Sequence, residues 1–282
     1  MPLKRSLLQP ILILAFIVCA TSAQPSESKW PTPTRELKII AQGGDKAWDS
    51  SIADVEKVCS SAAAALWKQF PERKLHPILV APKGGPIVLF RRGDKGEYLV
   101  RLNTGSNLWA QLAYQFSHEF MHILCAYVEA DTGNLWFEES LCELASLYSL
   151  RQMAITWKTN PPYSNWKDYA EKLGDYANDR IKASPLPDHM TLAQWYATEA
   201  ESLKTNPTQR EKNNILAVAL LPLIEKDPSQ WASVEYLNVG RTKEPRSFAR
   251  YLSDWHQNVP EKHKEFVLNV ATQLGVKVEV RK

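Results

Sequence analysis

The chain is poor in three features that would point to other classes of protein. It has only four cysteines among 282 residues, a formal net charge of only +3, and one long apolar run, at its N-terminus. A charge balance this close to neutral gives no support for binding nucleic acid or an anionic membrane surface. No later apolar segment approaches the length of a membrane span. Repeats and low-complexity tracts are also absent, while an aromatic content of 10% indicates a packed hydrophobic core.

The N-terminal apolar run has the pattern of a secretory signal peptide. Lys4 and Arg5 form a charged start, residues 11–20 are apolar, and the next three residues are small enough for cleavage. We therefore predict a signal peptide over residues 1–23, and a secreted or periplasmic protein. A lipoprotein anchored through Cys19 is an alternative, although the preceding residue is a bulky valine where such sites prefer a small one. Residues 24–35 contain three prolines and are predicted to form an extended leader.

Three cysteines follow the signal peptide: Cys59, Cys125 and Cys142. An odd number leaves at least one thiol unpaired or bonded to another molecule. Cys125 and Cys142 are predicted on two successive helices, and if these run antiparallel the thiols lie too far apart for a disulfide. A bridge from Cys59 to one of them and three buried free thiols are both open. None of the three has the spacing of a zinc-binding cysteine pair.

The most informative motif is His118-Glu119-Phe120-Met121-His122. On a helix, this spacing puts two imidazoles one turn apart, so that both can bind one zinc ion, and it leaves the Glu119 carboxylate beside the metal as a general base. The neighbouring residues sort into a polar and an apolar stripe, which indicates a helix with one buried side. The polar stripe comprises Gln111, Gln115, His118, His122, Cys125 and Glu129; the apolar stripe comprises Trp109, Ala113, Phe116, Phe120, Leu124 and Tyr127. Two unrelated histidines on an ordinary helix would not usually sort in this way.

A second helix, beginning near residue 135, offers a third zinc ligand. Glu139 and Glu143 share one stripe of this helix, with apolar residues opposite, whereas Glu138 falls to the side. Glu139 is therefore the predicted ligand. Glu143 lies one turn later and is placed to hold the outer ring nitrogen of His118, which would fix its tautomer. The alternative for Glu138 and Glu143 is a solvated helix face.

HEFMH at residues 118–122 and WFEES at residues 136–140, with Glu143 beyond them, resemble the gluzincin metallopeptidases, which include thermolysin and the zinc aminopeptidases. The resemblance implies an α+β fold with a zincin-like N-terminal subdomain, residues 36–150, built from a small mixed sheet and the HExxH helix. A mostly helical subdomain, residues 151–282, would follow and form the other wall of the cleft.

The same resemblance implies one zinc ion per chain, held by His118, His122 and Glu139. Glu119 would act as general base, with zinc-activated water, in hydrolysing a peptide or protein substrate. Two elements of the zinc aminopeptidases have no counterpart, the Gly-x-Met-Glu-Asn sequence and a downstream tyrosine that stabilises the oxyanion. A secreted binding protein that keeps the fold without turnover is therefore an alternative. A zinc hydrolase of a non-peptide amide is another.

The remaining elements are predicted from apolar periodicity and turn residues. Ser106 is placed to cap the motif helix. In the gluzincin fold the last strand before that helix is an exposed edge, so Leu99–Asn103 would pair with an extended substrate; an ordinary edge strand is the alternative. The predicted strands are Leu37–Ala41, Pro77–Val80, Ile87–Phe90 and Glu97–Asn103, and the predicted helices outside the motif are Trp48–Phe70, Trp166–Ala183, Leu192–Lys204, Lys212–Glu225 and Lys262–Leu274.

Overall fold

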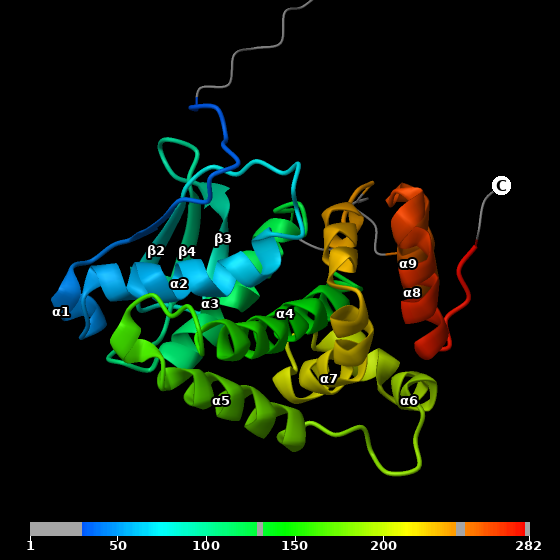
Figure 1. Ribbon diagram of the computed structural model, residues 1–282. Helices are drawn as coiled ribbons and strands as arrows, with labels where there is room; N and C mark the ends of the chain where they lie inside the picture. Colours follow the sequence, from blue (N-terminus) through cyan, green and yellow to red (C-terminus); the bar gives the residue numbers. More distant parts are fainter. Residues whose placement is uncertain (1–29, 129–131, 241–245, 280–282) are drawn as a thin grey trace, which may run out of the picture.

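The computed structural model describes residues 30–128, 132–240 and 246–279. The predicted signal peptide, the first half of the extended leader and Glu129 of the polar stripe lie outside these residues. The described chain is a mixed α+β structure, in which a small sheet lies beside a larger group of helices (Figure 1). At this level the predicted fold class is confirmed.

The sheet has four strands in the order β1-β2-β4-β3. Their bounds are Ile39–Ala41 for β1, Ile78–Pro82 for β2, Ile87–Arg92 for β3 and Tyr98–Leu102 for β4. β2 pairs in parallel with β1 and β4, and β3 pairs antiparallel with β4. Alternate residues of β4 are buried, as their two-residue period predicted: Tyr98, Val100 and Leu102.

The edge of the sheet differs from the prediction. β4 lies between β2 and β3, so the segment Leu99–Asn103 is not an exposed edge. The edge strand on this side is β3, because the β3–β4 hairpin folds the earlier strand to the outside of the later one. The order of strands along the chain therefore did not give their order in the sheet.

The predicted helix at Trp48–Phe70 corresponds to α2 (Ile52–Trp67), and a separate short helix, α1 (Asp45–Trp48), precedes it. Asp49 has a φ of 53°, in the left-handed region, which ends α1. Ser51 then begins α2, because its side chain accepts a hydrogen bond from the Asp54 backbone N–H. α2 packs against β1 and against α3 (Trp109–Leu124), the helix that carries the HExxH motif.

α4 (Leu135–Thr156) is the central helix and packs against α2 and α3. It crosses the predicted subdomain boundary at residue 150, and buried residues on both sides of that boundary form one continuous hydrophobic core. The predicted cap of α3 is wrong. Ser106 does not precede the helix directly, and its hydroxyl donates a 2.5 Å hydrogen bond to Asp49 Oδ2 instead.

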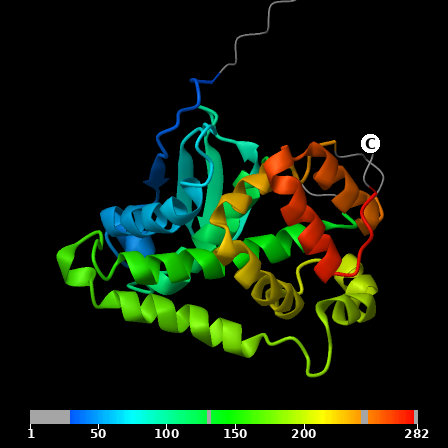
Figure 2. The ribbon, with the colours of Figure 1, turned by 45° about the vertical axis from the view of Figure 1, so that its right-hand side comes forward.

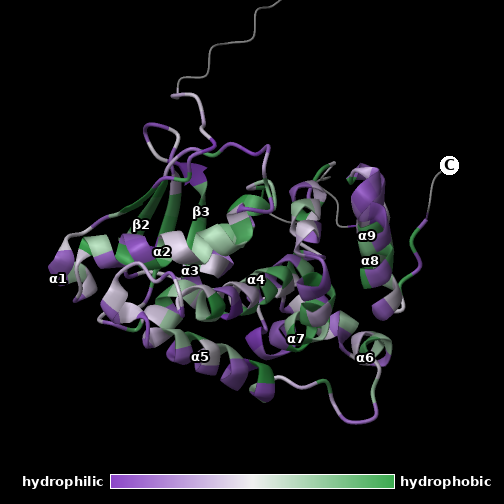
Figure 3. Ribbon diagram, viewed as in Figure 1, coloured by the Kyte–Doolittle hydropathy of each residue, from purple (hydrophilic) through white to green (hydrophobic). Residues whose placement is uncertain are grey.

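The helices after α4 pack around it. α5 and α7 contact α4, and Figure 2 shows α5 running alongside it. Hydrophobic residues concentrate on the strands and inner helices, whereas the outer face of α5 is largely hydrophilic (Figure 3). Within the described ranges, no helix is both long and apolar enough to cross a membrane. The bounds of this part are η1 Ser164–Trp166, α5 Tyr169–Ala183, α6 Leu192–Thr205, α7 Arg210–Lys226, η2 Pro228–Tyr236, α8 Phe248–Asn258 and α9 Glu261–Gln273. α8 and η2 were not predicted.

Candidate metal centre

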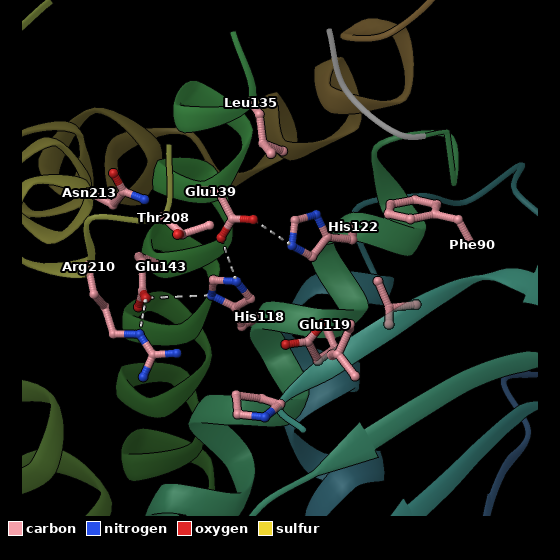
Figure 4. A pocket seen from close by; sticks show the side chains of 13 residues that line it. Phe90, His118, Glu119, His122, Leu135, Glu139, Glu143, Thr208, Arg210 and Asn213 are labelled. Carbon is pink, nitrogen blue, oxygen red and sulfur yellow. Dashed lines mark hydrogen bonds and ion pairs between the residues drawn. The ribbon is translucent and has the colours of Figure 1, made fainter. Parts of the chain in front are cut away.

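Helix α3 presents the two motif histidines to the N-terminal half of α4 (Figure 4). Gln111, Gln115 and His118 are the partly exposed residues of this helix, while Phe120 on the opposite stripe is fully buried. The first half of the predicted polar stripe is therefore the open side of the helix, whereas His122 and Cys125 of the same stripe are buried. The ring centroids of His118 and His122 lie 5.2 Å apart, as expected for residues one turn apart on the same face.

The side chain of Glu139, on α4, faces both imidazoles. Its Oε2 lies 3.1 Å from His118 Nε2, and its Oε1 lies 3.6 Å from His122 Nε2. Ligand atoms held about 2.1 Å from one tetrahedral zinc ion would be about 3.4 Å from each other. Each imidazole thus lies from one Glu139 oxygen at about the spacing that two ligands of one zinc ion would have.

The outer ring nitrogens of both histidines also face carboxylates. His122 Nδ1 lies 2.7 Å from Glu138 Oε1, and His118 Nδ1 lies 3.7 Å from Glu143 Oε1. At hydrogen-bond distance, Glu138 favours a ring proton on His122 Nδ1 and leaves the lone pair of Nε2 for a metal, whereas Glu143 lies near His118 Nδ1 beyond hydrogen-bond distance. The sequence had suggested this role for Glu143 but not for Glu138.

The interpretation of Glu138 and Glu143 as a solvated helix face is wrong, because their exposed fractions are 0% and 2%. Asn238 Nδ2 donates to Glu138 Oε2 at 2.6 Å, and the Tyr114 hydroxyl donates to Glu143. A buried carboxylate with partners of this kind is held in one position. Glu138 falls to the side of the ligand stripe, and that position in the sequence did not indicate its contact with His122. The need of His122 Nδ1 for an acceptor was the signal that could have identified it.

The hydrogen-bond pattern gives a second reason to expect a cation in this site. Where His122 Nδ1 donates to Glu138, the Nε2 of the same ring carries a lone pair that faces a Glu139 oxygen at 3.6 Å. Two acceptors that face each other in a buried site repel unless a proton or a metal ion lies between them. Donor type, spacing and charge therefore all fit zinc.

Cys142, one turn along α4 from Glu139, is an alternative third ligand. Its Sγ and one ring nitrogen from each of His118 and His122 lie within 4.8 Å of one another. We favour Glu139 for two reasons. Burial and nearby negative charge hold the pKa of the Cys142 thiol well above its ordinary value, which disfavours the thiolate that a metal needs. Glu139 also lines the open cavity, whereas Cys142 is fully buried behind it.

The titratable groups of the site lie close enough to shift one another's pKa values. Burial raises the pKa of Glu119 more than the facing His118 and His122 lower it. Burial opposes charge on His122, but the hydrogen bond and charge of Glu138 outweigh this and raise its pKa to about 9. The pKa of His118 is also raised, because burial is outweighed by the hydrogen bond of Glu139 and the surrounding carboxylates. In the metal-free protein a proton therefore occupies the position between acceptors where a cation would lie.

The side chains of His118, His122 and Glu139 face a cavity of about 340 Å³. β3 contributes Ile87 and Phe90 to its lining, and the start of α7 contributes Thr208, Arg210 and Asn213. Figure 4 shows Phe90 beyond His122 and Arg210 beyond His118, on opposite sides of the site. The two walls thus come from segments that precede and follow α4 in the sequence.

The three cysteines after the signal peptide are all free and buried. Of the two arrangements left open by the sequence, the structure has three buried free thiols. Burial raises the pKa of the Cys59 and Cys125 thiols as well, so none of them is poised to react.

Comparison of the chain with protein-family models, with curated proteins and with solved structures returns no match. The likeness to gluzincins therefore rests on the motifs in the sequence. Any function has to be argued from the geometry of the site itself.

Proposed function

We propose that this protein is an exported zinc-dependent metallopeptidase that hydrolyses peptide bonds. One observation carries the proposal: Nε2 of His118 and Nε2 of His122 both face the Glu139 carboxylate, while both Nδ1 atoms face buried carboxylates. A set of two histidines and one glutamate beside a cavity is the ligand set of a catalytic zinc site that keeps one position open.

Zinc bound by these residues would supply a Lewis acid that polarises a carbonyl and acidifies water. Glu119 supplies the proton chemistry. It lines the cavity beside the ligands and is only 3% exposed. Burial raises its pKa, which brings the carboxylate closer to the pH at which it works. Glu119 accepts a proton from the attacking water and donates it to the leaving amine.

Strand β3 would hold the peptide backbone. As the edge strand beside the cavity, it can add an extended peptide as a further strand through main-chain hydrogen bonds. The Tyr127 hydroxyl lies within hydrogen-bond distance of the carbonyls of Leu89 and Arg91 and donates its one proton there. A substrate peptide would therefore pair with the first half of β3, around Ile87. This proposal replaces the segment that the sequence had suggested.

The decisive experiment uses the protein without residues 1–23, loaded with zinc and offered a mixture of unfolded peptides. We expect cleavage that a chelator abolishes. Glu119→Gln should keep one equivalent of zinc by elemental analysis but lower turnover by about 10²- to 10⁴-fold. Glu201→Gln, at an exposed position on α6, is the matched control and should change neither quantity. If Glu119→Gln cleaved as fast as the parent, the proposed base would be wrong.

A secreted binding protein without turnover is the second candidate. It is favoured by one observation: among the described residues, the cavity lining includes no tyrosine and no third histidine to stabilise an oxyanion. The intact Glu119 argues against it. A protein that binds one equivalent of zinc yet leaves diverse unfolded peptides intact would support this candidate over the peptidase.

A further inference from the structure

A second pocket, of about 600 Å³, adjoins the metal-site cavity between the end of α5 and the start of α7. Arg210, on the first turn of α7, lines both spaces. Arg180, near the end of α5, lines the second pocket. A substrate peptide that extends from the metal site past Arg210 would therefore enter a pocket that has two guanidinium groups in its lining.

The two arginines are held differently. The Arg180 guanidinium lies 4.2 Å from the centre of the Tyr114 ring, and its Nη2 donates to the Tyr176 hydroxyl at 2.6 Å. Its Nε is buried and has no hydrogen-bond partner among the described residues. The Arg210 side chain is 60% exposed, and its Nε lies 3.6 Å from Glu143 Oε1. One guanidinium is thus fixed in the wall and the other lies at the mouth.

The two arginines of this pocket are matched in number by two carboxylates, Glu211 in its lining and Glu143 beside Arg210, so an anion is favoured only by the part of each guanidinium that no carboxylate covers. The ionisable lining residues of the pocket are Arg180, Arg210 and Glu211. Glu143 is 2% exposed and held by the Tyr114 hydroxyl, so it neutralises Arg210 from the protein side and leaves the solvent side open. Arginines with structural roles elsewhere in the described chain have close carboxylate partners, such as Arg151 with Glu225 at 2.5 Å. Among the described residues, no carboxylate lies within ion-pair distance of Arg180, although the charge of Glu143 also acts on it.

We propose that this pocket is a subsite for a carboxylate group of the substrate, so that the peptidase proposed above prefers acidic peptides. A guanidinium matches a carboxylate in shape and charge and can bind it through two parallel hydrogen bonds. The carboxylate is an aspartate or glutamate side chain, or the free C-terminus of the peptide. Among the described residues, those that line the opposite side of the metal site, Ile87 and Phe90, are apolar.

The test measures binding rather than cleavage, so that it does not depend on turnover. Zinc-loaded Glu119→Gln protein would be titrated in a calorimeter with octapeptides that are acetylated at the N-terminus and, in the first two of the three sets, amidated at the C-terminus. One set carries a single glutamate at each position in turn, a second set carries glutamine instead, and a third carries glutamine and a free C-terminal carboxylate. We expect at least one acidic peptide to bind about tenfold more tightly than its glutamine counterpart. The set in which this occurs identifies the source of the carboxylate.

Variants then locate the preference. In the same background, Arg210→Gln and Arg180→Gln should each reduce the ratio of acidic to neutral affinity toward one, while the affinity for neutral peptides changes little. Because each ratio is taken within one variant, a general loss of packing at Tyr114 cancels. Lys182→Gln is the matched control, since this lysine is exposed on the same helix as Arg180 and lines neither space. Its ratio should equal that of the parent.

Two results would overturn the subsite: equal affinity for acidic and neutral peptides, or a preference that survives in both arginine variants. Failure of the proposed function is distinguishable from both. A wild-type protein that binds acidic peptides through these arginines but never cleaves them would refute the peptidase and keep the subsite. One that cleaves neutral and acidic peptides equally well would refute the subsite alone.

Discussion

Glu138 Oε1 lies 2.7 Å from His122 Nδ1, and neither side chain has more than slight contact with solvent. The contact is the first link of a longer chain. Asn238 donates to the other oxygen of Glu138, and the Tyr251 hydroxyl donates to Asn238 Oδ1 at 2.9 Å. His122 on α3 is thereby linked, through Glu138, to Asn238 and Tyr251, which lie more than 100 residues later in the sequence.

We expect Glu138→Gln to lower zinc affinity by about 10- to 100-fold, the range found when an outer carboxylate partner of a metal-bound histidine is removed. The amide keeps the size of the side chain but removes the negative charge that favours the Nδ1–H tautomer and a basic Nε2. Competition with a chromophoric chelator measures the change. Glu225→Gln removes a carboxylate of similar size outside the site and should leave the affinity unaltered. An unchanged affinity in Glu138→Gln would mean that this carboxylate does not tune the ligand.

Arg73 holds the C-terminal end of the metal-binding helix. Its Nη2 donates to the carbonyl of Ile123 at 2.6 Å, its Nη1 donates to that of Leu124, and Glu235 lies 3.2 Å away. The last carbonyls of a helix lack partners within the helix and favour positive charge. We expect Arg73→Met to lower the free energy of unfolding by about 2–4 kcal/mol, because two charge-assisted hydrogen bonds are lost.

Chemical denaturation of the metal-free protein, followed by tryptophan fluorescence, measures this loss. Lys74→Met is the control. Lys74 is next to Arg73 in the sequence and is exposed, so this substitution should change the free energy of unfolding by less than about 0.5 kcal/mol. Equal stability of the two variants would show that Arg73 does not anchor the helix.

The stability of the metal-free protein should fall as the pH rises from about 6.5 to 9. The pKa of His122 is raised from 6.5 to about 9 in the fold. A raised pKa in the folded state contributes stability that is fully present below the unfolded value and is lost as the pH passes the folded value. His118 shifts in the same direction and adds to the effect. Thermal unfolding in the presence of chelator, scanned across this range, measures it.

The zinc-loaded protein should not follow this trend. A metal replaces the proton on the histidines, and its affinity rises with pH as that proton is lost. His256 and His263 do not disturb the comparison, because burial lowers their pKa values and moves their titration below the window. A melting temperature of the chelated protein that stays constant from pH 6.5 to 9 would contradict the assigned charge on the histidines.

Much of the fold could be predicted because its signals are local. The two-residue period of β4 and the stripes of α3 depend only on neighbouring residues. α8 also carried such a signal that was overlooked: Ser247 caps the helix through the Arg250 N–H, and Tyr251 and Trp255 are buried one turn apart. The order of the strands was not predictable in this way, because it depends on which side of β4 the hairpin folds.

The same distinction applies to the site. Within α3, helical geometry alone brings His118, Glu119 and His122 together, and the packing of α4 on α3 adds Glu139. Arg210 could not be predicted, since no local pattern indicates that the first turn of α7 reaches the metal site. Packing of distant helices decides that contact.

The choice of third ligand is tested by replacing zinc with cobalt. A thiolate bound to cobalt gives intense absorption in the near ultraviolet, whereas a carboxylate does not. With Glu139 as ligand, the wild-type protein should lack this absorption, Cys142→Ala should keep full metal affinity, and Glu139→Ala should lose more than the roughly 100-fold attributed above to an outer carboxylate. If Cys142 bound the metal instead, the absorption would be present in wild type and lost in Cys142→Ala. Because the two residues lie about one turn apart on the same side of α4, the spectrum reports directly on which of them reaches the two imidazoles.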